Sequence, residues 1–344
     1  MTGIWKKWTA VVPAPFLTAL LLGAGYLGFV TWDQSWWWRQ KPDYSFGWLV
    51  PCFVAFVVHD RWPRITAGLR DCAAPGSPRA SGLAGRLLQL AVPATLVAGA
   101  GLFFLGALYR AGAGASQPGT LALSLGAGLL LLTTLFLEAP APDGLIAPAA
   151  GITSDARFRL IALFVFPAFV WLVSAPMVSV VENDLSLFLL RIVSRIVSLV
   201  FDGLGLPIQQ EGNVLVLPPV NGVENRVGVA EACSGIRSQT ACLFSGSFLA
   251  AVFLERFWKK ALLVVMAMVL AFATNILRSL FLTGWAYYRG AAAMEAQVHD
   301  IAGYSVLGLT VIGLLCLLPI LNLKISFGRR GATSSQPAGG GPVA

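Results

Sequence analysis

Residues 261–282 read ALLVVMAMVLAFATNILRSLFL, a run in which Asn275 and Arg278 are the strongly polar side chains. A helix needs about 20 predominantly apolar residues to cross the hydrocarbon core of a bilayer. This run therefore predicts a transmembrane helix. Similar runs recur along the chain, the second of them short, and they predict about eight spans: Val11–Val30, Phe46–Val58, Leu87–Tyr109, Leu121–Leu137, Leu160–Val181, Ser234–Leu254, Ala261–Leu282 and Ile301–Leu323.

The composition agrees with an all-α polytopic membrane protein. The 344 residues are 57% hydrophobic and only 12% charged, whereas soluble domains are about 25% charged. Five cysteines are scattered without paired spacing, so neither a disulfide framework nor a metal site is predicted, and no cofactor is expected. The net charge of +8 reflects basic loops, and no nucleic-acid partner is predicted.

Basic residues are distributed unevenly among the loops. Because Lys and Arg collect in cytoplasmic loops, the more basic loops are predicted to be cytoplasmic, together with both termini. We expect a membrane domain over residues 1–327 and a disordered cytoplasmic tail over 328–344. The basic residues on this side are Lys6, Lys7, Arg61, Arg64, Arg70, Arg79, Arg86, Arg157, Arg159, Arg256, Lys259, Lys260, Lys324, Arg329 and Arg330.

The opposite side receives a long segment, Glu182–Ala232, before the sixth span. Its first part, Asp184–Asp202, is amphipathic at helical spacing, which predicts a helix lying in the membrane interface. Residues 207–218 then predict a small extracytoplasmic β-hairpin with its turn at 211–213. The expected polar stripe of the interfacial helix is Arg191, Ser194, Arg195, Ser198 and Asp202.

Three reactive side chains fall at the predicted outer ends of spans. Cys233 opens the sixth span, where the helix dipole and Arg237 favour a thiolate. Arg278 lies near the outer end of the seventh, and His299 starts the eighth. Each has a structural alternative: a buried cysteine, an arginine reaching the headgroups and an interfacial histidine. Together they provide the groups that a cysteine hydrolase or acyl-transferase requires.

Five stretches of the chain resemble the exosortase/archaeosortase family of membrane cysteine transpeptidases. The resemblance covers most of the chain, and the cysteine block is its most specific part. Phe46 stands where many relatives have histidine. The stretches are Tyr44–Pro51 (YSFGWLVP), residues 205–214 (GLPIQQEGNV), Val229–Ser238 (VAEACSGIRS), Asn275–Arg278 (NILR) and His299–Gly303 (HDIAG).

The resemblance implies that Cys233 is the nucleophile and that Arg278 and His299 complete the catalytic group. It also implies a bacterial plasma (inner) membrane location and exported substrates that end in a sorting signal. Such a signal has a short motif, often Pro-Glu-Pro, then a membrane helix and a basic tail. The acceptor, an amine or an envelope glycan or lipid, is left open. Supporting positions are expected at Glu231, Ser234, Arg237 and Asn275.

Two other functions fit a polytopic chain with polar residues at membrane depth. One is a transporter or a flippase for lipid-linked sugars, and the other is a non-catalytic factor for envelope polysaccharide export. Transporters are commonly built from repeated halves with broken helices, and no internal repeat is apparent in this sequence. Preferential labelling of Cys233 over the other cysteines would favour the enzyme.

Overall fold

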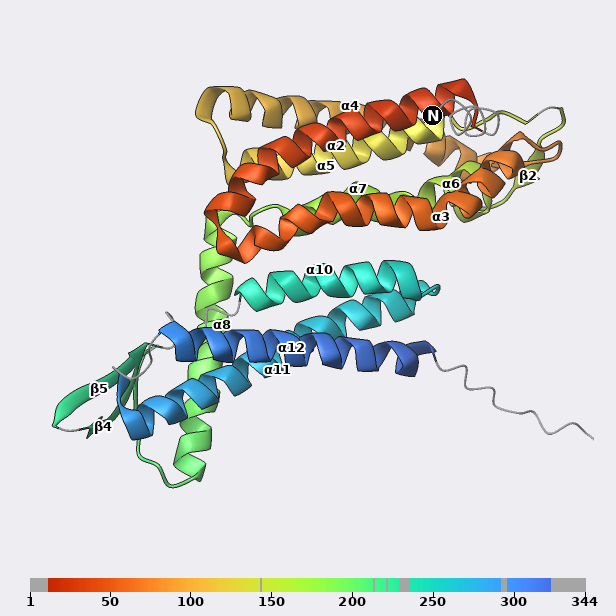
Figure 1. The fold of residues 1–344 in the computed structure, drawn as a ribbon. Coiled ribbons are helices and arrows are strands. Elements are labelled where there is room, and N and C mark those ends of the chain that lie inside the picture. Colours follow the sequence, from red (N-terminus) through yellow and green to blue (C-terminus); the bar gives the residue numbers. More distant parts are fainter. Residues whose placement is uncertain are drawn as a thin grey trace, which may run out of the picture.

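The computed structural model describes residues 12–142, 144–212, 214–220, 222–228, 236–291 and 296–322. Helices dominate the described part, as the composition predicts. Two groups of roughly parallel helices lie side by side, α2 to α7 and α10 to α12, and α8 runs across them near one end (Figure 1). The start of α2 and the end of α12 lie at the opposite end. The predicted tail, 328–344, lies outside the described residues.

The first group is built around one apolar core. Its elements are α2 (Ala14–Gln40), η1 (Pro42–Leu49), α3 (Val50–Ala73), α4 (Gly82–Ala113), α5 (Gln117–Leu137), α6 (Ala156–Ala162) and α7 (Val165–Ser174). Fully buried side chains such as Phe16, Ile65 and Leu135 fill its centre. α4 and α5 approach closely, since a Cβ on Gly126 would lie 2.5 Å from the Phe103 nitrogen.

Among the described residues, six helices are long and apolar enough to cross a membrane: Ala14–Gln40, Gly82–Ala113, Gln117–Leu137, Ala156–Ser174, Phe257–Arg289 and Ile301–Leu321. The chain is thus a multi-pass membrane protein. Two of the expected spans, corresponding to α3 and α10, are not among the six. α3 carries Asp60, Arg61 and Arg64 near its middle, and the apolar part of α10, Ser238–Phe253, is short.

The second group contains α10 (Ile236–Phe253), α11 (Phe257–Arg289) and α12 (Ala296–Asn322). Leu263, Ala267 and Leu314 belong to its buried core. The Thr274 and Thr310 hydroxyl groups share a hydrogen bond of 3.0 Å between α11 and α12. Such polar contacts and small interfacial residues stabilise helix pairs in lipid, where apolar burial alone gives no preference for protein over lipid.

The segment between the two groups contains α8 (Ser179–Gly203) and a three-stranded antiparallel sheet. The strands are β3 (Gln209–Glu211), β4 (Val214–Val220) and β5 (Val223–Gly228), with Glu211 opposite Val214. A separate parallel pair, β1 (Pro78–Ala80) with β2 (Ala147–Ala149), was not predicted.

The direction of α8 agrees with a helix lying across the others (Figure 1), but its predicted polar stripe is wrong at one position. Ser194 is fully buried beside Val193 and Val197. By contrast, Leu199 is 72% exposed. α8 packs on α11 and β4. The face that makes these contacts is rotated from the face predicted by hydrophobicity alone, because the sheet covers one side of the helix.

Candidate active site

The described structure contains only part of the expected catalytic group. Cys233, with Glu231 and Ser234, lies outside the described residues. Arg237 and His299 lie in the first turns of α10 and α12, and their side chains are outside the described set. Asn275 and Arg278, both on α11, are described in full.

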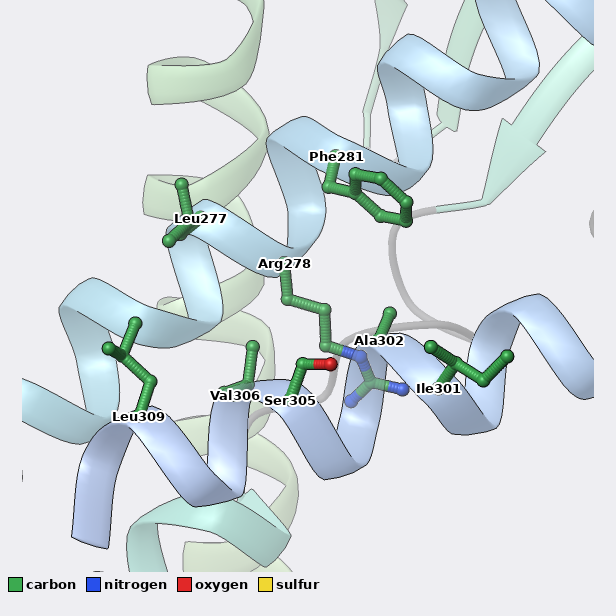
Figure 2. Close-up of a pocket in the computed structure, with 8 residues that line it drawn as sticks. All are labelled: Leu277, Arg278, Phe281, Ile301, Ala302, Ser305, Val306 and Leu309. Atoms are coloured by element: carbon green, nitrogen blue, oxygen red, sulfur yellow. The ribbon is translucent and has the colours of Figure 1, made fainter. Parts of the chain in front are cut away.

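Arg278 extends from α11 toward the beginning of α12 (Figure 2). A Cβ built on Gly303 would lie 3.8 Å from one terminal nitrogen of its guanidinium group. His299 precedes Gly303 by one helical turn, so the two residues share a face of α12. The backbone therefore brings the His299 position and the Arg278 side chain to the same part of the α11–α12 interface.

Asn275 lies one turn before Arg278 on α11 and is buried. The Ser279 hydroxyl, also buried, donates to the Asn275 carbonyl oxygen over 3.0 Å. These polar groups lie at the face of α11 that packs inside the protein, which is where a polar residue of a membrane helix is expected. The two positions of the Asn-x-x-Arg block thus lie on one side of α11.

The start of α10 contacts η1, which contains most of the Tyr44–Pro51 element. The Thr240 hydroxyl donates to the Asp43 carbonyl oxygen over 3.2 Å, and Gln239 beside it is buried. α10 begins at Ile236, within the cysteine block and three residues after Cys233. The 3₁₀ helix η1 therefore supports the helix that follows Cys233, although the two segments are far apart in the sequence.

The packing around η1 explains the residue type at two of its positions, Tyr44 and Gly47. The buried Tyr44 hydroxyl accepts a hydrogen bond from the Met177 backbone N–H at 3.0 Å, and burial raises the pKa of Tyr44 to about 12. Gly47 leaves room for Trp38, since a Cβ there would lie 2.1 Å from the indole nitrogen. That nitrogen donates to the Ser174 carbonyl oxygen over 3.1 Å. The Tyr44 contact joins η1 to the segment that leads into α8, and the Trp38 contact joins α2 to the end of α7.

Phe46 belongs to a ladder of aromatic rings between the first group and α10. Its ring stacks on Phe244 at a centroid distance of 5.1 Å. Phe244 also stacks on Phe53, at 5.3 Å, and Phe53 stacks on Phe248 at 4.1 Å. The departure from histidine therefore places an apolar ring in a packing role, and Phe46 has no acid–base group to contribute.

Sequence reasoning missed Asn225, which connects the sheet to the end of α11. Its side-chain nitrogen donates to the Ala286 carbonyl oxygen at 2.9 Å, and its side-chain oxygen accepts from the Ala291 N–H at 2.8 Å. Asn225 shares a strand face with buried Val227, so a polar residue at an inward position of β5 was the available signal. Along the chain, β5 precedes Cys233 and Ala291 precedes α12.

A pocket of about 340 Å³ opens beside Arg278 between α11 and α12 (Figure 2). The guanidinium and the Ser305 hydroxyl are the polar groups of a wall that is otherwise apolar. Its remaining lining residues are Leu277, Phe281, Ile301, Ala302, Val306 and Leu309.

The fold and the polar groups near one end of its helices define a polytopic membrane protein with a site in the α10–α12 group. The chain belongs to the transmembrane exosortase family (Exosortase_EpsH), whose model matches residues 37–316. The match includes η1, the cysteine block, Arg278 and the first part of α12, so the family resemblance of the sequence is confirmed. No curated protein and no solved structure matches the chain. Exosortases are membrane transpeptidases, and the chain is assigned to that enzyme class.

Proposed function

We propose that this exosortase cleaves the C-terminal sorting signal of exported proteins at the outer face of the bacterial plasma membrane and transfers the protein to an acceptor. The observation that carries the proposal is the Arg278 guanidinium beside Gly303, one turn from His299. The orientation rests on loop charge, with eight passes and both termini in the cytoplasm. The start of α2 and the end of α12 at the same end of the bundle support an even number of passes.

The proposed reaction is acyl transfer through a thioester. The Cys233 thiolate attacks the carbonyl carbon of a peptide bond just outside the membrane, forming a C–S bond. Arg278 and free N–H groups at the start of α10 stabilise the oxyanion that develops on the carbonyl oxygen. As the C–N bond breaks, His299 gives a proton to the departing amine.

The second half-reaction releases the protein from Cys233. His299 accepts a proton from the incoming acceptor, which attacks the thioester and returns the thiolate. An amine or a hydroxyl of an envelope glycan or lipid gives transfer, and water gives hydrolysis. Glu231, Ser234, Arg237 and Asn275 position these groups. Membrane lipids surround the outer surface of the helices.

The direct test replaces Cys233 with alanine in the full-length chain and follows processing of an exported protein that carries a Pro-Glu-Pro motif, an apolar helix and a basic tail. We expect processing to be lost while membrane insertion is kept. Cys316→Ala is the matched control because Cys316 is an exposed cysteine of α12. Full processing by Cys233→Ala, with the protein present in the membrane, would refute the proposal.

Thiol labelling separates this function from a transporter. A membrane-impermeant maleimide added from outside should label Cys233 first, because Cys242 is only 3% exposed and Cys52 and Cys316 lie on apolar helix surfaces. Single-cysteine variants measure each rate. Equal rates at Cys233 and Cys316 would contradict an activated, outward-facing thiol.

A further inference from the structure

The pocket beside Arg278 is a groove that opens away from the core of the α10–α12 group. Three of its apolar lining residues are more than half exposed: Leu277 at 53%, Phe281 at 51% and Ile301 at 65%. Asn275 and Ser279 lie on the internal face of α11 and are buried. Leu277 and Phe281 lie on its exposed side, and Arg278, which is half-buried, lies at the edge between the two faces. In a membrane protein such a surface contacts lipid or another membrane helix.

The groove runs along the helices. Phe281 and Ile301 lie at one end, and Leu277 and Leu309 lie at the other (Figure 2). With a rise of 1.5 Å per residue, the stretch of α12 from Ile301 to Leu309 is about 12 Å long. This length corresponds to about two turns of a helix placed alongside.

The floor of the groove consists of small residues. Ala302 and Ser305 of α12 line it between the larger side chains. Small residues let a neighbouring helix approach closely, which is the main source of helix association in lipid. Arg278 adds a cationic side chain to this floor, close to Ser305 and Ala302 (Figure 2).

We infer that this groove seats the membrane helix of the exported substrate, with the carbonyl to be attacked beside Arg278. The inference rests on the proposed function, in which the peptide bound at Arg278 continues directly into an apolar helix. The groove contains Arg278 and extends from it in the direction of the surrounding helices. The groove matches both parts of such a substrate. The guanidinium can bind the polar carbonyl, and the apolar walls can contact the apolar helix.

Photo-crosslinking identifies what occupies the groove. It uses the full Cys233→Ala chain, in which we expect the substrate to bind but not to be cleaved. The probe is an epitope-tagged exported protein with a Pro-Glu-Pro motif, an apolar helix of about 20 residues and a basic tail. p-Benzoylphenylalanine replaces Leu309 in the groove or, as the control, Val97 of α4, which is 72% exposed. We expect a crosslink to the probe from position 309 and none from position 97.

A crosslink of equal yield from both positions, or none from position 309, would overturn the inference. Crosslinking from position 309 to lipid alone would also overturn it, since a lipid chain would then be the occupant. Processing of the same probe by the chain with Cys233 intact is scored separately. Processing without a crosslink would refute only the inference that the groove seats the substrate helix. A crosslink without processing would refute only the proposed reaction.

Filling the groove provides a second test. Ser305→Trp should abolish processing of the probe, because the indole would occupy the floor on which the substrate helix packs. Val97→Trp is the control and should leave processing unchanged. Both variants are compared at equal amounts in the membrane. Normal processing by Ser305→Trp would overturn the inference.

Discussion

The side-chain amide of Asn225 in β5 donates a hydrogen bond to the Ala286 carbonyl oxygen near the end of α11, over 2.9 Å. The same side chain accepts from the N–H of Ala291, beyond the helix end. One buried amide thus joins the strand that leads toward Cys233 to the connection that leads toward His299. We infer that it fixes the spacing of these two segments.

Replacing Asn225 with alanine should therefore loosen the end of α11. Each lost partner of a buried polar group costs about 1–3 kcal/mol, and we expect lower stability together with reduced processing. Hydrogen exchange of the amides at 286–291 measures the local effect. Gln210→Ala is the control, since Gln210 lies on the exposed strand β3. Unchanged exchange in Asn225→Ala would show that the amide is not the anchor.

The aromatic ladder predicts that Phe244 is important for stability. Phe244 is 2% exposed and stacks on both Phe46 and Phe53. Phe244→Ala should lower the free energy of unfolding by about 3–5 kcal/mol, as is typical for a buried phenylalanine. Thermal unfolding in detergent measures the loss. Phe104→Ala, on an exposed position of α4, should change it little.

Phe46 itself can be tested for a purely packing role. Phe46→Leu keeps an apolar side chain against Phe244, and we expect it to retain processing of a sorting-signal substrate. The assay compares the initial rate of processing at equal protein amounts. If Phe46→Leu were folded and inactive, the aromatic ring would contribute more than packing.

Arg61 should stabilise the contact between the two helix groups. Its buried guanidinium donates to the Leu163 carbonyl oxygen at the break between α6 and α7, and to that of Ala251 near the end of α10, at 3.0 Å. Arg61→Met would leave both oxygens without this donor, at about 1–3 kcal/mol each. We expect a lower melting temperature than for Arg64→Met, in which an exposed side chain is changed. Equal melting temperatures would contradict the bridging role.

We expect the contacts of Asp155 at the N-terminus of α6 to be sensitive to acid. Burial would raise the pKa of its carboxyl group, but hydrogen bonds from Arg157 and the Ala80 N–H, with the charge of Arg157, outweigh burial and lower it. A lowered pKa means that the carboxylate stabilises the fold above its unfolded pKa of about 3.9 and loses this contribution as pH falls further.

The corresponding experiment follows melting temperature from pH 7 to pH 3 in detergent. Wild type should lose stability below about pH 4, whereas Asp155→Asn should be less stable at pH 7 and less sensitive to acid. Asp71→Asn is the control, because Asp71 is exposed on α3. The same acid dependence in wild type and Asp155→Asn would rule out this carboxylate as the cause.

The sequence by itself determined the class of fold and the order of the functional segments. Hydropathy identified the spans Leu121–Leu137 and Ala261–Leu282 because a bilayer requires long apolar helices whatever their neighbours are. The family followed from short blocks around Cys233, Arg278 and His299, whose residue types and order are visible without a structure.

Only the tertiary structure decided which side chains meet. Hydropathy does not select between lipid and protein for an apolar helix face, since both are equally apolar. The proximity of Arg278 to Gly303, the stacking of Phe46 on Phe244 and the burial of Ser194 in α8 therefore depend on how the helices pack. The hydrogen bonds of Asn225 likewise exist because the sheet folds back onto the end of α11, a contact that no local pattern specifies.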